Sequence, residues 1–218
     1  MRPAGLDAAR ARMVRDLARR HPGCEPRVLE AMARIPRHPF VDEALWGRAY
    51  DDEALPIGYG QTISRPSTVA RMTSALGVGP EDRVLEVGTG SGYQTAVLAC
   101  LAGRVCSVEL LPALAVRART ILDRLGLPGV EVRPGDGSLG WPERAPFDRI
   151  LVTAAAAEVP RALLDQLAVD GSLVVPVGRG DGQEILLIRR TGPEAWSRRT
   201  LEPCRFVPLR AEAGGRSA

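Results

Sequence analysis

The chain has 218 residues, of which 45% are hydrophobic and 25% are charged. These values are typical of one globular domain, or of a domain with a small extra lobe. The sequence contains no run of about 18 apolar residues, which a membrane span requires. Its start carries arginines and acids but lacks the apolar stretch of a secretory signal. We therefore expect a cytoplasmic protein that makes no membrane contact.

The net charge is +3, and every basic residue is an arginine. A nucleic-acid-binding protein is expected to cluster its positive charge. Here the arginines are spread along the chain among acids, and the densest group, residues 10–20, is typical of the solvated face of a helix. The charge pattern therefore does not favour a nucleic-acid partner.

Cysteines and histidines are few and form no metal-binding spacing. No pair has the form C-x-x-C, so we expect buried free thiols in a reducing compartment and no metal site. The residues concerned are Cys24, Cys100, Cys106, Cys204, His21 and His38.

The first third of the chain predicts a helical region. Apolar residues recur at helical spacing over residues 6–20, 26–36 and 66–76. Pro66 suits the first turn of the third helix and Gly77 can terminate it, whereas residues 40–63 are irregular. We expect residues 1–77 to form an N-terminal helical cap that includes a substrate loop.

From residue 83 the pattern changes to alternating strands and helices. Strands are expected at residues 83–88, 104–110, 130–136, 147–155 and 171–178, and helices at 91–102, 112–126 and 160–169. The near-continuous apolar runs are typical of strands covered on both faces, and the alternation predicts an α/β fold with a doubly wound, mainly parallel, Rossmann-like sheet. Two final strands joined by the turn TGPEAW would make the sheet mixed at its C-terminal edge. This core would span residues 78–210, with a disordered tail at 211–218.

A glycine-rich turn lies between the first strand of this core and its helix. Gly88, Gly90 and Gly92 follow Glu86 in the pattern E-x-G-x-G-x-G. A dinucleotide fingerprint, G-x-G-x-x-G, would need its third glycine at the position of Tyr93, and a carboxylate at Glu86 would repel a pyrophosphate. The same carboxylate suits a cation such as the ammonium of methionine, directly or through water. The pattern resembles the first motif of S-adenosylmethionine-dependent methyltransferases.

Two further acids follow strands of the predicted sheet. Glu109 ends the second strand, where an acid can accept hydrogen bonds from both ribose hydroxyls. Asp136 follows the third strand, and methyltransferases of this kind place an acid there near the adenine amino group, followed by a small residue, here Gly137. The alternatives are an exposed strand-end acid for Glu109 and an ordinary Asp-Gly turn for Asp136.

The segment Gly58-Tyr59-Gly60-Gln61-Thr62-Ile63-Ser64-Arg65-Pro66 closely resembles the G-x-G-Q-T-I-S-x-P signature of the protein-L-isoaspartate (D-aspartate) O-methyltransferase family. Further segments match that family over roughly residues 10–210: LEVGTGSGYQTAVLA, GDG-x-x-GW, APFDRILVTAAA, ALLDQLAVDGSLVVPVG and RFVPL. One departure is Ser67, where many relatives carry an aromatic residue, which affects the shape of the peptide groove.

The resemblance implies that Ser64 hydrogen-bonds the substrate carboxylate; without it, Ser64 reads as a loop residue and helix cap. It implies methyl transfer from S-adenosyl-L-methionine, without a metal, to the free carboxyl of isoaspartyl residues in damaged proteins and peptides. The resulting ester would start repair through a succinimide. We expect a monomer.

Three alternatives compete with this interpretation. A related aspartyl O-methyltransferase dedicated to one biosynthetic peptide often carries an extra C-terminal domain, whereas this sequence stops about ten residues after RFVPLR. A non-catalytic binding module predicts erosion of the glycine or serine motifs, and both are intact. A nucleic-acid methyltransferase usually shows N/D-P-P-Y/F or Pro-Cys after the fourth strand, where this chain has Thr153-Ala154-Ala155-Ala156.

Overall fold

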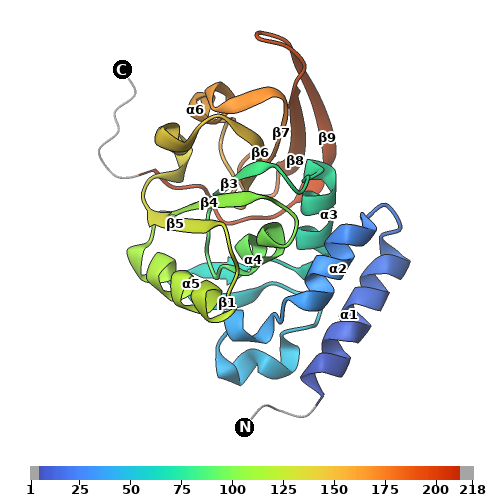
Figure 1. Cartoon of the computed structure of the whole chain (residues 1–218). Coiled ribbons are helices and arrows are strands. Elements are labelled where there is room, and N and C mark those ends of the chain that lie inside the picture. The colour runs from blue at the N-terminus through green and yellow to red at the C-terminus, as the bar shows by residue number, and fades with distance from the viewer. Residues whose placement is uncertain (1–4, 212–218) are drawn as a thin grey trace.

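A computed structural model describes residues 5–211 of the chain (Figure 1). Residues 212–218 of the expected tail lie outside the described residues. The α-helices are α1 (Leu6–Arg20), α2 (Pro26–Arg34), α3 (Pro66–Leu76), α4 (Tyr93–Ala99), α5 (Pro112–Arg124) and α6 (Arg161–Asp165). The strands are β1 (Leu55–Gly58), β2 (Gln61–Ile63), β3 (Arg83–Val87), β4 (Arg104–Glu109), β5 (Val130–Pro134), β6 (Phe147–Val152), β7 (Leu167–Val177), β8 (Gln183–Arg190) and β9 (Trp196–Cys204). None of the described helices is long and apolar enough to cross a membrane.

Seven strands form the main sheet in the order β5-β4-β3-β6-β7-β8-β9. The first five are parallel, while β8 pairs antiparallel with both β7 and β9. The mixed, Rossmann-like sheet predicted from the sequence is therefore confirmed. The chain builds outward from β3 in one direction through β4 and β5, and in the other through β6 and β7. This reversal creates a crevice beyond the carboxyl ends of β3 and β6, where open α/β sheets bind ligands.

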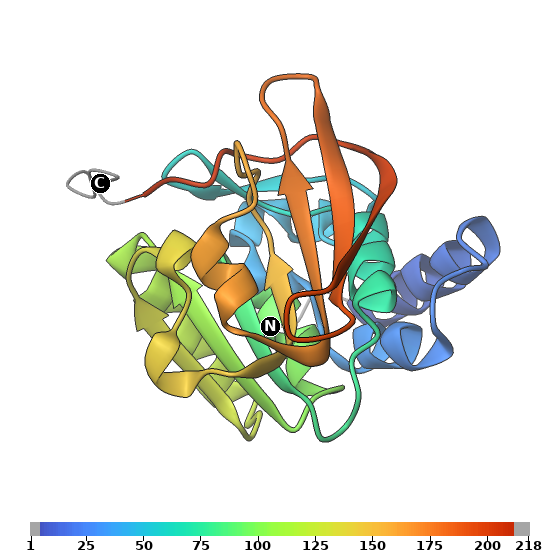
Figure 2. The same cartoon turned by 90° about the horizontal axis from the view of Figure 1, so that it is seen from above.

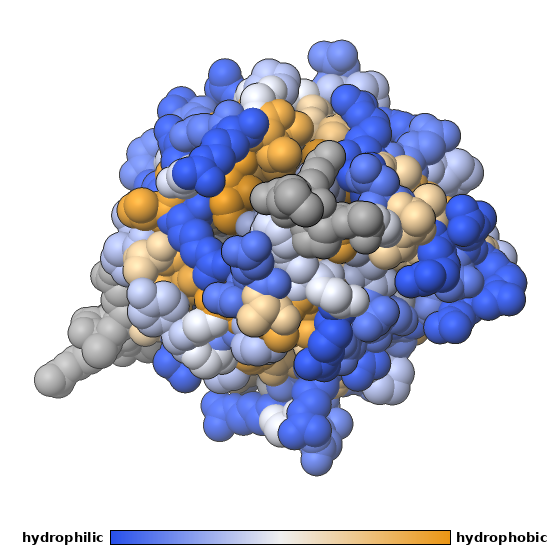
Figure 3. Space-filling model, turned by 90° about the horizontal axis from the view of Figure 1, so that it is seen from below, coloured by the Kyte–Doolittle hydropathy of each residue, from blue (hydrophilic) through white to orange (hydrophobic). Residues whose placement is uncertain are grey.

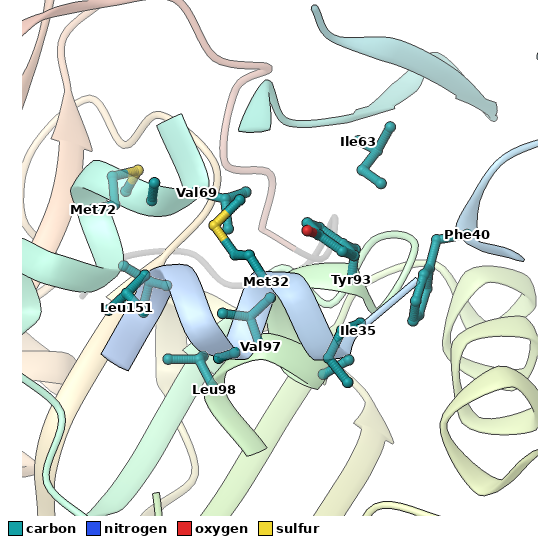
Figure 4. Packing of buried hydrophobic residues seen from close by; sticks show 14 of the residues in the cluster. Met32, Ile35, Phe40, Ile63, Val69, Met72, Tyr93, Val97, Leu98 and Leu151 are labelled. Carbon is teal, nitrogen blue, oxygen red and sulfur yellow. The ribbon is translucent and has the colours of Figure 1, made fainter. Parts of the chain in front are cut away.

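Side chains alternate along the strands between two hydrophobic layers. In β3, Val84 belongs to the layer that also contains residues of α1 to α5, whereas Leu85 and Val87 face the layer containing Leu163 of α6. The N-terminal helices share the first layer, since Met32 of α2 lies between α3 and α4 (Figure 4). The face that is seen from below is mostly hydrophilic, with smaller hydrophobic areas between the polar side chains (Figure 3).

Two expectations about local structure are corrected. The helix expected at residues 160–169 ends at Asp165, and β7 begins at Leu167. Leu167 is fully buried and pairs with Phe147 of β6, so sheet pairing overrides the helical spacing of this apolar run. The irregular stretch at residues 40–63 contains a 3-10 helix, η2 (Glu43–Arg48), and the antiparallel β1–β2 hairpin.

The cysteines are all free, but only two are buried as expected. Cys24 and Cys106 are buried, whereas Cys100 and Cys204 are partly exposed. Cys100 is the C-cap of α4, and Cys204 is the last residue of β9, which lies at the edge of the sheet and pairs only with β8. Seen from above, β8 and β9 stand beside α3 (Figure 2), where Nη1 of Arg71 lies 2.5 Å from Oε2 of Glu202.

Candidate active site

A pocket of about 950 Å³, including its mouth, lies at the carboxyl ends of β3, β4 and β6. Four chain segments line it, at residues 61–64, 87–91, 108–111 and 207–210, together with Val69, Tyr93, Gln94, Gly137, Thr153 and Ala154. The pocket therefore brings together the glycine loop, the end of β4 and the Gln-Thr-Ile-Ser segment.

The glycine loop needs its first glycine for steric reasons. Gly88 has φ of 96°, and a Cβ at this position would lie 2.4 Å from Oγ1 of Thr153. That hydroxyl is fixed, because it donates to the carbonyl of Gly88 at 2.6 Å. Gly90 has φ of 53° and lines the pocket as well. At these two positions the pocket wall is therefore backbone without a side chain.

Gly92 has a different position from the other two glycines. It precedes α4 as its N-cap with φ of 89°, and a Cβ would come within 3.1 Å of Cβ of Ala118 on α5. It is absent from the pocket lining. Gly92 thus permits the loop-to-helix turn and the close approach of α5, and its structural role is steric.

Glu109 faces the pocket and also organises its walls. Its Oε2 accepts a hydrogen bond from the backbone N–H of Gly90 at 2.8 Å, and its Oε1 accepts one from Leu111 at 2.9 Å. Each carboxylate oxygen retains a further acceptor site. Glu109 is therefore placed to accept hydroxyl hydrogen bonds from a ligand while holding the glycine loop against β4.

Glu86 is not part of the pocket lining. Strand alternation turns its side chain to the same face as Val84, into the layer between β3 and α4, where it is 0% exposed. Its Oε2 accepts from Oγ1 of Thr95 at 2.5 Å and Oγ of Ser107 at 2.6 Å, while Oε1 has no partner. Burial raises the pKa of Glu86 to about 8, against the two hydrogen bonds that lower it. A direct contact between this carboxylate and a ligand ammonium is thus not supported by the geometry.

Gly137 lines the pocket, whereas Asp136 stands just behind it. Asp136 is the N-cap of η3 (Gly137–Leu139), and its Oδ1 accepts from the backbone N–H and Oγ of Ser138 at 2.8 and 2.6 Å. A Cβ on Gly137 would lie 2.5 Å from Cγ1 of Val87. The Asp-Gly pair therefore forms a capped turn that brings backbone close to β3.

Ser64 lines the pocket between β2 and α3. The turn before it has three successive residues with positive φ, Gly58, Tyr59 and Gly60, and Tyr59 is 64% exposed at its tip. The proposed helix-cap role of Ser64 is not borne out, because Arg65 is the N-cap of α3 and no side chain of the cap accepts a bond there. Trp46, which is partly buried, packs against the hydrophobic core.

One wall of the pocket is a segment near the C-terminal end for which the sequence motifs predicted no role. Residues 207–210 form one wall, next to Thr153 and Ala154 after β6. The backbone N–H of Ala155 donates to Val207 at 2.8 Å, and that of Leu209 donates to Ala155 at 2.7 Å. The RFVPL motif was visible in the sequence, but its place beside β6 depends on a contact far along the chain.

No group of three or more histidine, cysteine or acidic side chains is arranged to hold a metal ion in the described part of the chain. Neither histidine lies in the pocket lining. Nδ1 of His38 lies 2.9 Å from the hydroxyl of Tyr50 in the core, and His21 lines a separate groove beside Arg71.

Comparison with known proteins identifies the family. The model of the protein-L-isoaspartate (D-aspartate) O-methyltransferase family matches residues 8–214. The chain belongs to this family. A protein-L-isoaspartate O-methyltransferase of Magnetococcus marinus is 56% identical over 190 residues, covering 87% of this chain and 83% of the relative. Another, of Syntrophotalea carbinolica, is 50% identical over 206 residues and covers 94% and 95%.

Solved structures of protein-L-isoaspartate O-methyltransferases share the fold. One has a TM-score of 0.84 at 29% identity and covers 94% of this chain and 66% of the longer relative. A putative member from Plasmodium falciparum, in complex with S-adenosyl-L-homocysteine, has a TM-score of 0.79 at 25% identity and covers 92% of this chain and 98% of the relative. S-adenosyl-L-homocysteine is S-adenosylmethionine without the transferred methyl group.

Proposed function

We propose that this chain transfers a methyl group from S-adenosyl-L-methionine to the free carboxyl of isoaspartyl residues in damaged proteins and peptides. The observation that supports this most directly is the composition of one pocket. The glycine loop and Glu109 form one side of it, and the Gln61–Ser64 segment of the family signature forms another. Cofactor and acceptor would thus meet in a single cavity.

On the cofactor side, this chain would hold the nucleoside through backbone and one carboxylate. Gly88 and Gly90 allow close approach of the ligand, and Glu109 can accept from the ribose hydroxyls. Gly137 leaves room beside β3, with Asp136 behind it. Glu86 and Gly92 would support this loop from beneath rather than touch the ligand. When bound, S-adenosylmethionine supplies an already activated sulfonium methyl group.

On the acceptor side, the chemistry needs no general base. A carboxylic acid with a reference pKa of about 3.9 is ionised at neutral pH, so the nucleophile is already anionic. Ser64 lines the pocket, and its hydroxyl can donate to one carboxylate oxygen while the other faces the methyl group. The protein's task is to hold oxygen, methyl carbon and sulfur in line at attack distance.

The enzyme's part of the reaction ends when the methyl ester has formed. The backbone amide nitrogen that follows the ester attacks its carbonyl, methanol departs, and a succinimide ring forms. Water opens this ring at either carbonyl, which returns part of the material to normal aspartate. The enzyme therefore needs to recognise a carboxyl group next to a peptide and has no role in ring closure.

A paired-peptide assay tests the proposal. Purified protein is incubated with S-adenosylmethionine labelled in its methyl group and with two peptides that differ only in Asp or isoAsp. Base-labile label should appear in the isoAsp peptide alone, and across several unrelated sequences. Methylation of Asp peptides, or of one sequence only, would favour the dedicated peptide-modifying enzyme instead.

Ser64→Ala provides the residue-level test. It should lower turnover with isoAsp peptides more than it lowers cofactor affinity, because it removes a group that orients the acceptor. Calorimetry with S-adenosyl-L-homocysteine measures the second quantity. Wild-type turnover in this variant would remove Ser64 from the acceptor site.

We also infer a cytoplasmic monomer that needs no nucleic acid. Many arginines in the described chain are engaged locally, as in the Arg149–Asp82 and Arg48–Glu53 pairs, rather than gathered on one basic face. Light scattering during gel filtration should give the mass of one chain, 23.4 kDa. A mass of twice this value would overturn the monomer.

A further inference from the structure

The first turn of α3, directly after Ser64, is capped from a distant part of the chain. Arg65 is the N-cap and offers no capping oxygen, and Pro66 has no backbone N–H. The first free donor of the helix is therefore the N–H of Ser67. It donates to Oδ1 of Asp52 at 2.8 Å. A carboxylate at a helix N-terminus is favoured by both the hydrogen bond and the helix dipole.

Asp52 stands on a short loop that a buried arginine holds in place. Arg37 is 0% exposed. Its Nε donates to the carbonyl of Ala49 at 2.8 Å, and its Nη2 donates to that of Glu53 at 3.3 Å. These two carbonyls flank Asp52, so the guanidinium fixes the loop on both sides of the capping residue.

Arg37 is unusual as a buried cation. No ion pair within 4.0 Å joins it to a carboxylate among the described residues, although the nearby charge of Asp52 raises its pKa, and its Nη1 has no hydrogen-bond partner. Burial lowers its pKa to about 10. Its guanidinium carbon lies 5.0 Å from the ring centre of Tyr93, which is itself part of the pocket wall. A buried cation is costly without such partners, and here its hydrogen bonds serve loop carbonyls beside the pocket.

We propose that Asp52 is a positioning residue for Ser64, and that Arg37 holds the loop that carries it. The inference rests on the proposed function, in which Ser64 orients the acceptor carboxylate. Ser64 lies three residues before Ser67, with a proline between them, so pinning the N–H of Ser67 fixes the direction in which the chain enters the helix. Displacements of about 1 Å at a reacting group are enough to slow a reaction strongly.

Substitutions at Asp52 separate this role from a purely structural one. Asp52→Ala removes the cap, whereas Asp52→Asn keeps an acceptor oxygen in the same position. Asp42→Ala is the matched control, because Oδ1 of Asp42 caps η2 by accepting from the N–H of Ala44 at 3.0 Å. All variants are assayed as the full chain for kcat and KM with an isoAsp peptide, for affinity to S-adenosyl-L-homocysteine, and for Tm.

We expect Asp52→Ala to lower kcat/KM for the peptide about five- to tenfold, a factor that corresponds to the free energy contributed by one helix-capping side chain. Affinity for S-adenosyl-L-homocysteine should stay within about twofold of wild type, and Asp52→Asn should restore most of the loss. Asp42→Ala should retain wild-type kcat/KM. Equal kcat/KM for Asp52→Ala and wild type, or no rescue by Asn, would overturn the proposal.

Coupling to Ser64 gives a second test. In a Ser64→Ala background, adding Asp52→Ala should change kcat/KM by less than about twofold, because both substitutions act on the same contact. Additive losses would show that Asp52 acts elsewhere.

A readout without turnover keeps this inference separate from the proposed function. Amide hydrogen exchange should accelerate at residues 67–69 in Asp52→Ala and not in Asp42→Ala. Unchanged exchange would refute the capping role even in an active enzyme. If the wild type is inactive but exchange is still faster in Asp52→Ala, the isoaspartyl activity is refuted while the capping of α3 by Asp52 holds. The positioning of Ser64 for catalysis would then be refuted as well.

Discussion

Replacing Glu86 by glutamine tests whether this acid is a buried neutral group or a charged cofactor ligand. The side chain is fully buried against Thr95 and Ser107, and burial raises its pKa from 4.5 to about 8. Between these two pH values the acid is protonated in the folded chain and ionised in the unfolded chain. The folded state therefore binds more protons, and its stability falls as pH rises.

The size of the effect follows from the shift. One pKa unit corresponds to 1.36 kcal/mol, so a shift from 4.5 to about 8 corresponds to roughly 4 to 5 kcal/mol of stability. That stability is fully present below pH 4.5 and is lost as pH rises through about 8. Glu86→Gln carries no ionisable group, so this loss should be missing. At pH 9 the variant should be more stable than wild type, whereas near pH 5 wild type should equal or exceed it.

Urea denaturation from pH 5 to pH 9 measures this difference. The raised pKa values of the four thiols affect both proteins alike, so they cancel in the comparison. Glu81→Gln, in an exposed turn, controls for the loss of one acid. Parallel stability profiles for wild type and Glu86→Gln would refute the buried neutral acid. So would a loss of cofactor affinity above about tenfold at pH 7, about 1.4 kcal/mol, since that would require a charged carboxylate facing the ligand.

Three further outcomes are expected. Glu109→Ala should weaken binding of S-adenosylmethionine by about 1.5 to 3 kcal/mol in calorimetry, the usual value for hydrogen bonds to a charged group, and unchanged affinity in a folded variant would remove this residue from the site. Gly137→Ala should lower the free energy of unfolding, measured by urea denaturation, by about 1 to 3 kcal/mol, because its Cβ would lie 2.5 Å from Cγ1 of Val87. Wild-type stability in this variant would show that Val87 can move aside without cost. The single-turnover rate of methyl transfer should change little from about pH 6 to about pH 8, both in the wild type and in the His21→Gln, His38→Gln double variant. A rise of the rate through about pH 6.5 that the double variant lacks would indicate a histidine base.

Local signals in the sequence predicted those parts of the fold that depend on neighbouring residues. Helix α3 was expected at residues 66–76, and the structure has the same bounds. The strand–glycine–helix unit around Gly88 was also expected, because a Gly-rich turn between two apolar runs restricts the chain to few conformations. Where local and long-range preferences disagreed, the prediction failed, as at Leu167, whose apolar neighbours have helical spacing while its backbone pairs with β6.

For this protein, the sequence by itself determined the fold class, the glycine-rich turn after β3 and the family, because these depend on contiguous motifs. Tertiary structure alone decided which motif residues face the pocket. Glu86 belongs to the motif, yet strand alternation turns it toward α4, while Val207 enters the pocket wall through pairing with the chain after β6. The capping of α3 by Asp52 could not be predicted from the sequence either. Its donor, the N–H of Ser67, and its acceptor, Oδ1 of Asp52, lie apart along the chain, and they meet in a loop that the buried Arg37 holds. Motifs record what residues a site needs, whereas burial and packing decide which of them touch the ligand and which hold the others in place.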